Sequence, residues 1–281
     1  MKIAVAVPIL NQAAVSQEFF DLLRENEGNT KPAIVIIDNG SKEPVSDWIK
    51  GLRDGDIISR NQENIGVLPA LNQAWEILKE KEIDYIFYTH NDVMIYEKGW
   101  DDKIIQVLEE QNLHGQKVGV AGFYGAKAIG VPGLYNHQYY MQDLIRMENV
   151  SNCTRMDPGH GYRPIRNGYC EDVAVMDGFS LIVSVELLNR IGGFDKNYPP
   201  HHMYDNDMCL HSLDEGYRNI VISMDAQHLG GRTDVGEDWA SGFGKTKQQI
   251  HQEAHPIFYE EWSPTNMHNG KHKICLPVRV A

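Results

Sequence analysis

Apolar and polar residues alternate along the first half of the chain in blocks that predict strands and helices in turn. Short runs rich in Val, Ile and Ala are separated by longer segments whose apolar side chains recur at helical spacing. The predicted strands are residues 3–7, 33–37, 56–59, 85–88 and 117–121, and the predicted helices are residues 13–25, 68–81 and 99–111. Strands separated by helices imply right-handed crossovers, so we expect an α/β fold with an open, mostly parallel twisted sheet flanked by helices.

The pattern changes after Gly122. Residues 123–170 are rich in Gly, Tyr, Asn, Pro and His and have weak periodicity, which predicts a long loop-rich insertion. Insertions of this length in a compact domain are usually functional, and we expect this one to bind the substrate that accepts a transferred group. Further elements are predicted as strands at 173–184 and 218–223 and as helices at 185–190, 207–215 and 245–254. We therefore expect one domain, residues 1–241, with halves 1–122 and 123–241, followed by a C-terminal helical extension, residues 242–281.

Composition is that of an ordinary globular protein: 281 residues, 42% hydrophobic and 23% charged. The formal net charge of −13 argues against a surface that grips nucleic acid through many phosphates. No run reaches the roughly 18 apolar residues that span a bilayer, and the apolar N-terminus lacks a small-residue cleavage site. These features predict a cytoplasmic protein without a transmembrane segment.

The predicted strand at 85–88 ends in the polar residues His90, Asn91 and Asp92. Open α/β sheets present catalytic groups at the carboxyl ends of such strands. If the strand continues, His90 and Asp92 share one side of it, and an imidazole beside a carboxylate suits a divalent cation such as Mn²⁺ or Mg²⁺ that bridges to phosphate. The alternative is a strand that ends in a turn-forming Asn-Asp pair.

Polar clusters also follow the first two strands and open the second long helix. They contain Pro8 and Asn11, then Asp38 and Asn39, then Asn64, Gly66 and Asn72. A carboxylate after a strand can accept a hydrogen bond from a nucleobase, and the N–H groups at a helix start favour phosphate. Each cluster alone is equally compatible with a turn or a helix cap, but their order after successive strands favours a functional site.

This ordered set resembles the family 2 glycosyltransferases of the GT-A fold over roughly residues 1–235. The motifs are Pro-x-x-Asn at 8–11, Asp-Asn-Gly-Ser at 38–41, Asn-x-Gly-x-x-x-Ala-x-Asn at 64–72, Met-Asp-Gly-Phe-Ser at 176–180, Ile-Gly-Gly-Phe-Asp at 191–195, Tyr-Asp-Asn-Asp at 204–207 and His228. The resemblance implies an inverting, metal-dependent enzyme of polysaccharide biosynthesis. Its donor would be a nucleoside-diphosphate sugar, a UDP- or dTDP-sugar, and its acceptor a glycan or glycolipid. The extension is a candidate to close the acceptor cleft or to mediate a homodimer.

The resemblance also implies a role for individual residues. The donor would be bound by Pro8, Asn11, Asp38, Asn39, Asn64, Gly66, Asn72, Asn91 and Asp92, with Asp38 on the nucleobase. Mn²⁺ or Mg²⁺ would be held by His90, Asp92 and His228. Asp205 would be the catalytic base, beside the acceptor-binding residues Gly178, Tyr204 and Asp207.

Two departures from the family pattern leave alternatives open. His90 replaces the first acid of the Asp-x-Asp motif, although imidazole is a good ligand for Mn²⁺. Tyr204 replaces the Glu that precedes the base, which leaves Asp207 as a competitor of Asp205. A protein that kept the fold and binds nucleotide sugar or glycan without catalysis is therefore an alternative. Two other enzyme classes are disfavoured. A nucleotidyltransferase would need a Gly-rich basic loop after the first strand, and a dehydrogenase would need a GxGxxG motif there, but residues 8–12 provide neither.

Several His and Trp residues lie outside these motifs. His201 and His202 are adjacent, and His251 and His255 are four apart on a predicted helix. Without the Glu of a zincin motif, solvated or hydrogen-bonded histidines are the favoured interpretation. Trp239 is interpreted as a packing anchor rather than a residue that stacks on sugar rings.

Overall fold

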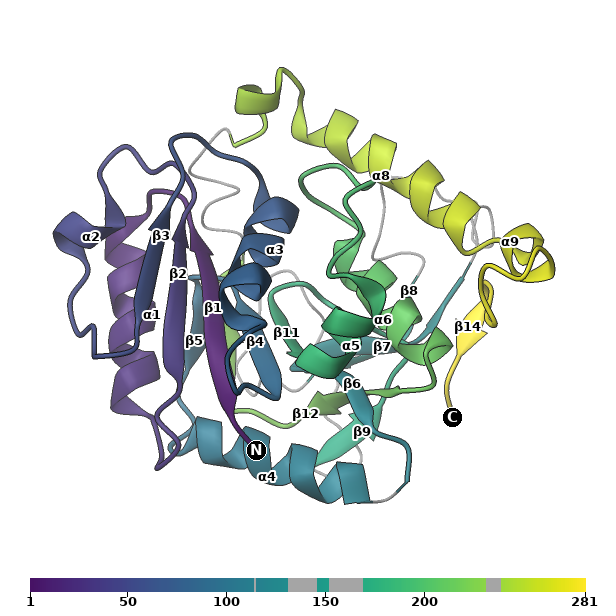
Figure 1. The fold of residues 1–281 in the computed structure, drawn as a ribbon, viewed down its shortest axis with the longest axis horizontal. Coiled ribbons are helices and arrows are strands. Elements are labelled where there is room, and N and C mark those ends of the chain that lie inside the picture. Colours follow the sequence, from purple (N-terminus) through teal and green to yellow (C-terminus); the bar gives the residue numbers. More distant parts are fainter. Residues whose placement is uncertain (114, 131–145, 152–168, 231–238) are drawn as a thin grey trace.

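The computed structural model describes residues 1–113, 115–130, 146–151, 169–230 and 239–281. Its centre is an eight-stranded sheet with the order β3-β2-β1-β4-β11-β6-β12-β9 (Figure 1). The bounds are β1 Ile3–Ile9, β2 Ala33–Asp38, β3 Ile57–Arg60, β4 Tyr85–Thr89, β6 Val118–Gly122, β9 Cys170–Asp172, β11 Ser180–Ser184 and β12 Arg218–Ile222. The expected mostly parallel α/β sheet is confirmed, with β11 inserted antiparallel between β4 and β6.

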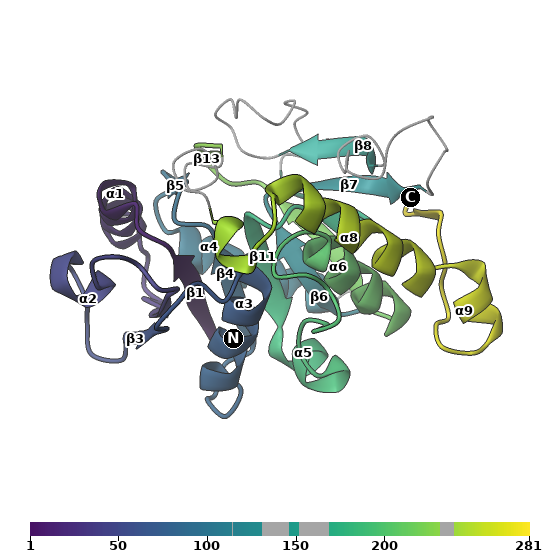
Figure 2. The same ribbon diagram turned by 90° about the horizontal axis from the view of Figure 1, so that it is seen from above.

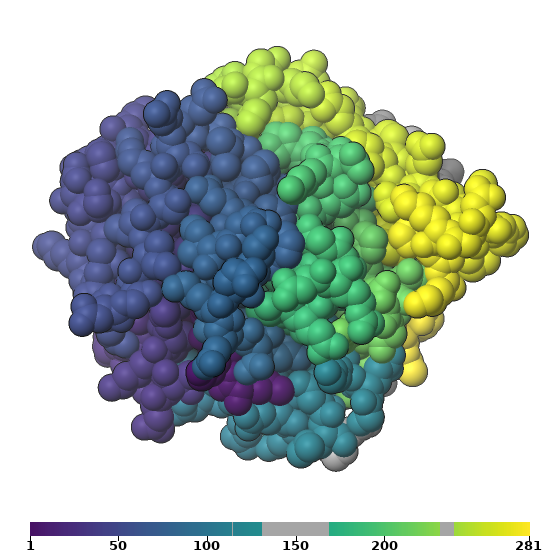
Figure 3. Space-filling view, in the orientation of Figure 1, coloured from purple at the N-terminus to yellow at the C-terminus, as the bar shows by residue number. Residues whose placement is uncertain are grey.

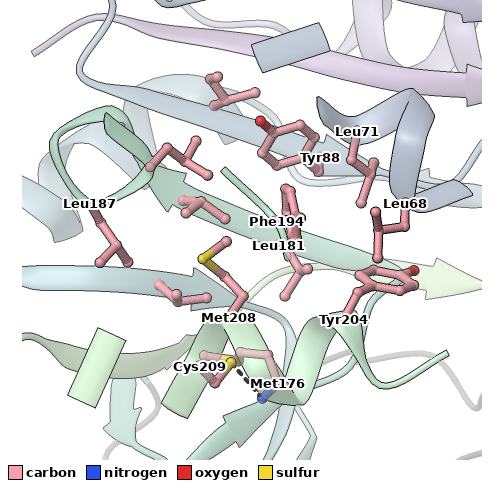
Figure 4. Packing of buried hydrophobic residues seen from close by; sticks show 14 of the residues in the cluster. Leu68, Leu71, Tyr88, Met176, Leu181, Leu187, Phe194, Tyr204, Met208 and Cys209 are labelled. Atoms are coloured by element: carbon pink, nitrogen blue, oxygen red, sulfur yellow. Dashed lines mark hydrogen bonds between the residues drawn. The ribbon is translucent and has the colours of Figure 1, made fainter. Parts of the chain in front are cut away.

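Helices cover both faces of this sheet. They are α1 Ala13–Glu25, α2 Val45–Trp48, α3 Val67–Leu78, α4 Trp100–Leu113, α5 Val185–Ile191 and α6 Tyr204–Asp214. Strand β1 shows how the sheet separates two cores, because Ala4 packs in one hydrophobic cluster and Val5 in the other. Figure 4 shows the first cluster, where Leu71 of α3 and Met208 of α6 face the same space. The sheet is thus buried on both sides, as the apolar strand runs predicted.

The strand directions bring the motifs to one edge of the sheet. β1 runs parallel to β2 and β4, so the residues after Ile9, Asp38 and Thr89 emerge together. β11 runs the other way, and its first residue, Ser180, pairs with Thr89. The turn at residues 177–179, which precedes β11, therefore lies at the same edge.

The structure corrects several expectations for the second half. The segment 123–170 contains two strands, β7 Tyr124–Ile129 and β8 Arg146–Ser151, while residues 131–145 and 152–168 lie outside the described residues. The single strand expected at 173–184 is wrong: β9 and β11 belong to the large sheet, but β10 Val175–Met176 between them pairs with β7. Two further strands, β5 Val93–Ile95 and β13 Ala226–His228, were not expected, because three residues are too few to show a period.

The C-terminal extension packs on α6. It contains the 3-10 turn η2 Ser241–Phe243, the helices α8 Lys247–Glu261 and α9 Pro264–His268, and strand β14 Val278–Arg279, which pairs with β7. Helix α8 continues past the expected end at residue 254, because Phe258 and Trp262 join the first hydrophobic cluster. Figure 2 shows α8 lying beside α6, and the space-filling view of Figure 3 shows the light-green and yellow extension along the upper right of the molecule. None of the helices in the described part of the chain combines the length and the apolar composition of a membrane span.

Candidate functional site

A pocket lies at the carboxyl edge of β1, β2 and β4. It is lined by Pro8, Ile9, Leu10, Asn39, Asn64, Gly66, Val67, His90, Asn91, Asp92, His201 and Trp239. Seven of the lining residues were singled out by the motifs, and they lie at or after the ends of these strands or just before α3: Pro8, Asn39, Asn64, Gly66, His90, Asn91 and Asp92. Motifs that are separate in the sequence thus lie together at one edge of the sheet, because the strands that precede them are parallel.

His90, Asp92 and His228 form a compact group at this edge. One ligand atom of each lies within 4.8 Å of the others, and Asp92 and His228 are buried. The short ribbon of β5 and β13 brings His228 opposite Val93, which sets its Nε2 3.3 Å from Oδ1 of Asp92. The ring of His228 also stacks on Phe179 of the turn before β11, with centroids 4.5 Å apart. The group therefore depends on three separate parts of the chain.

The burial, hydrogen bonding and protonation of the His90 ring are those expected of a metal ligand. Its Nε2 atom is buried and makes no hydrogen bond to the described residues. Burial lowers the pKa of His90, against the opposing charge of Asp92, so the imidazole is neutral at neutral pH and keeps a lone pair. A divalent cation is one group that would satisfy this nitrogen together with the Asp92 carboxylate.

The start of α3 is held by a network of amide side chains. Asn39 donates from Nδ2 to Asn64 Oδ1 at 2.9 Å and to the Gly66 carbonyl at 3.1 Å. Asn64 accepts the Gly66 N–H at 2.9 Å and donates to the Trp239 carbonyl at 3.2 Å. Gly66 has φ 92°, and a Cβ there would lie 2.2 Å from the Cβ of Pro200. Close packing of this turn against the segment before α6 therefore requires glycine.

Other expected donor residues bind neighbouring protein groups. The buried Asp38 carboxylate accepts the N–H groups of Ser41 at 2.9 Å and Val45 at 3.0 Å and pairs with Arg60. These bonds fix the loop after β2 and the Arg60 side chain beside it.

Three asparagines act in a similar way. Asn11 Oδ1 accepts the Lys42 N–H at 2.8 Å, and Asn91 Nδ2 donates to Ser16 Oγ at 2.7 Å. Asn72 bonds both the N–H and the carbonyl of Phe194, each at 2.9 Å. Asn72, the last residue of the motif at 64–72, thus joins α3 to the Gly-Gly-Phe turn after α5. Asn11, Asp38 and Asn72 are not among the residues that line the pocket.

The two candidate bases lie in the first turn of α6 in different surroundings. Asp205 accepts the Gly178 N–H at 3.0 Å, which places its carboxylate against the turn that carries Phe179. Asp207 points under the extension, where its Oδ1 accepts from Trp262 Nε1 at 2.9 Å and from the Tyr198 hydroxyl at 3.2 Å. Burial raises the pKa of Asp207 to about 6.

Gly178 and Tyr204 are close neighbours of Asp205. A Cβ on Gly178 would lie 2.5 Å from the Tyr204 hydroxyl, so a larger residue at this position would have to displace the end of the Tyr204 side chain. None of these three residues is among those that line the pocket.

Five lining residues lie outside the predicted site: Ile9, Leu10, Val67, His201 and Trp239, of which the last two bring polar or aromatic rings. His201 and Trp239 both line the pocket, and their rings stack with centroids 4.8 Å apart. Trp239 was assigned to packing, but it borders the pocket as well. The available signal was position in the sequence: His201 comes shortly before the Tyr-Asp-Asn-Asp motif, and Trp239 comes after His228.

Comparisons with known proteins agree on one class. Residues 66–262 match the glycosyltransferase-like family. No curated protein matches significantly in sequence. Among solved structures, mannosyltransferase PcManGT from Pyrobaculum calidifontis, in complex with GDP-Man and Mn²⁺, is 18% identical with a TM-score of 0.53. That match covers 82% of this chain and 58% of the mannosyltransferase, so this chain spans less than two thirds of its length.

A second solved structure is TarS from S. aureus, residues 1–349. It is 16% identical, has a TM-score of 0.50, and is matched over 98% of this chain and 76% of its own. At these identities the two likenesses bear on the fold.

Proposed function

The chain belongs to the glycosyltransferase-like family, with the GT-A fold that the motifs predicted, and we propose that it is an inverting, metal-dependent transferase. It would move a sugar from a nucleoside diphosphate to a hydroxyl group of a glycan or glycolipid. The observation that carries this proposal is the group of His90, Asp92 and His228 at the edge of the donor pocket.

His90, Asp92 and His228 would hold Mn²⁺ or Mg²⁺, which when bound offsets the negative charge that builds up on the leaving diphosphate. The buried Asp92 carboxylate and the rings of His90 and His228 would supply the donor atoms. Asn39 and Asn64 fix the N-terminal end of α3, whose N–H groups would face a phosphate. The His201–Trp239 stack would border the bound nucleotide or sugar.

Asp205 is the proposed base. Its carboxylate would take the proton of the acceptor hydroxyl while that oxygen bonds to the anomeric carbon. The bond from this carbon to the diphosphate oxygen breaks, and its electron pair leaves with the diphosphate. Attack from the opposite face inverts the configuration. The preference for Asp205 rests on its contact with the Gly178 turn, because Asp207 is occupied by Trp262 and Tyr198.

The test is donor binding measured by thermal stability. UDP-, dTDP-, GDP- and CDP-sugars are added with and without Mn²⁺; UDP- and dTDP-sugars are the expected donors, and GDP-mannose is included because PcManGT binds it. A ligand at about 100 times its Kd stabilises by ~2.7 kcal/mol. We expect a metal-dependent shift with one nucleotide that Asp92→Ala abolishes. Asp172→Ala, which removes an ion pair with Arg218, serves as the matched control and keeps the shift. The absence of any shift in the native protein contradicts the proposal.

A second candidate is a binding protein without transfer activity. It is supported by His90 and Tyr204, which stand where the family pattern has acids, and by the position of Asp205 outside the pocket lining. Release of free nucleoside diphosphate from the bound donor separates the two candidates. Slow release in the presence of Mn²⁺ supports the transferase, whereas binding without release supports the second candidate.

A further inference from the structure

A second cluster of histidines lies between the segment before α6 and the extension. His201 and His202 precede α6, and His251 lies on α8. One ring nitrogen of each lies within 4.8 Å of the others. His255, one turn along α8, brings its Nε2 to 2.7 Å from Nε2 of His202. Four imidazoles from two distant segments thus converge on one place, which sequence spacing alone did not indicate.

The arrangement is compact. The rings of His202 and His251 stack with centroids 4.1 Å apart and an interplanar angle of 16°, and His202 and His255 stack at 4.9 Å. The backbone at His202 has φ 85° and at Met203 φ 63°, a region that residues other than glycine seldom adopt. Such a conformation persists only where the surroundings impose it, and such positions cluster at ligand-binding sites.

The donor set differs from that of the first site. The group around Asp92 combines a carboxylate with imidazoles, whereas the group around His202 consists of imidazoles alone. Carboxylate oxygen suits Mg²⁺ and Mn²⁺, and imidazole suits zinc, copper and nickel. In a tetrahedral zinc site with Zn–N bonds of ~2.0–2.1 Å, ligand atoms lie roughly 3.4 Å apart. To reach that value from a spacing of up to 4.8 Å, the ring nitrogens would approach by up to roughly 1.4 Å, and the stacked rings would turn toward a common point.

We propose that His201, His202 and His251 bind a zinc ion that fastens the C-terminal extension to the border of the donor pocket. His255 supports the site through its hydrogen bond to His202, in the way that groups behind a metal-bound histidine orient its ring. His201 belongs to both places, because it lines the donor pocket and stacks on Trp239. The ion therefore links the position of α8 to the shape of the pocket.

The experiment uses the full chain without a polyhistidine tag, stripped of metal with a chelator and returned to chelator-free buffer. Zn²⁺ binding is measured by competition with a chromophoric chelator and by thermal stability. All variants are made in an Asp92→Ala background, so that the first site does not contribute. We expect one equivalent of Zn²⁺ and a raised Tm, and no comparable rise with Mn²⁺.

Substitutions at His251 separate ligation from packing. His251→Phe keeps a ring to stack on His202 but has no nitrogen, so we expect Zn²⁺ affinity to fall by at least tenfold. His251→Cys loses the ring but offers a thiolate, so it keeps zinc binding. His268→Ala removes an exposed histidine of α9 and serves as the control without effect. Circular dichroism verifies that each variant is folded.

The proposal is overturned if the Asp92→Ala protein binds no Zn²⁺, or if His251→Phe binds it as tightly as its parent. Because no sugar nucleotide is used, this result is independent of the donor-binding test: a failure here leaves the transferase proposal intact, and the reverse also holds.

Discussion

The Nε2 atom of His228 lies 3.3 Å from the Oδ1 atom of Asp92, although the two residues come from opposite halves of the chain. The contact is made by pairing of β13 with β5, directly beyond the carboxyl end of β4. His228, which lies on β13 in the second half of the chain, thereby completes the group that His90 and Asp92 form after β4. The position of His228 therefore depends on the pairing of β13 with β5 and on its stacking on Phe179, and His228 provides the first test of the proposed metal site.

Replacing His228 is expected to weaken the response to metal. His228→Gln removes the imidazole beside Asp92 while keeping a polar side chain of similar length. We expect the Mn²⁺ concentration that gives half-maximal transfer to rise tenfold or more, because a ligand nitrogen is lost. Initial rates over a Mn²⁺ series measure this, with His268→Ala as the control. An unchanged Mn²⁺ requirement would show that His228 only packs on Phe179.

His90 is expected to set the preference between metals. His90→Asp exchanges a nitrogen ligand for an oxygen ligand, and oxygen ligands suit Mg²⁺ better. The ratio of the rate with Mg²⁺ to the rate with Mn²⁺ should therefore increase relative to the native protein. The same ratio in both proteins would contradict a ligand role for the buried His90 Nε2.

The two aspartates of α6 give a matched pair of variants. Asp205→Asn removes the proposed base, so the turnover number should fall by ~10²–10⁴-fold while the donor Kd changes little. Asp207→Asn retains an oxygen that accepts from Trp262 and Tyr198 and should cause a much smaller loss. Single-turnover rates and donor titration of both variants distinguish the roles. The opposite ranking would move the base to Asp207.

The first half of the fold could be read from the sequence because its signals are local. The helix predicted at residues 13–25 is α1, and the strand predicted at 85–88 is one residue shorter than β4. Strands β7 and β8 lie in a segment without clear periodicity, and their pairing joins residues distant in sequence. The antiparallel insertion of β11 between β4 and β6 is likewise a long-range arrangement that no local pattern encodes.

The pocket was predictable as far as it is built from residues that follow parallel strands. His201 and Trp239 enter it from other elements. They are brought near α3 by the Leu68 N–H bond to the Pro200 carbonyl, 3.1 Å, and by the bond from Asn64 to the Trp239 carbonyl. Motif residues also divide in a way that the sequence does not reveal. Asn64 lines the pocket, whereas both amide atoms of Asn72 bind the Phe194 backbone. The residue type alone therefore does not show whether a polar side chain in a motif lines the pocket or hydrogen-bonds to the protein backbone.

The buried position of Asp207 predicts a specific dependence of stability on pH. Its pKa is raised from 3.8 to about 6 by burial, with His211 opposing the shift. Between about pH 4 and pH 6 the folded protein holds this proton while the unfolded chain has lost it. The contribution of Asp207 to the free energy of unfolding therefore falls as pH rises through this window and is constant above it.

Asp207→Asn should remove this penalty. The free energy of unfolding of the variant, relative to the native protein, should increase by roughly 3 kcal/mol from pH 4 to pH 7. Urea denaturation at several pH values measures it. Asp102→Asn is the control of opposite sign, because the N–H of Asn29 and the hydroxyl of Thr30 lower the pKa of Asp102. That variant should lose most stability at neutral pH and less as pH falls. The free energy of unfolding of Asp207→Asn, relative to the native protein, could instead be the same at every pH. In that case the native Asp207 carboxyl group is not desolvated, and the close packing of Trp262 on Asp207 would be refuted in solution.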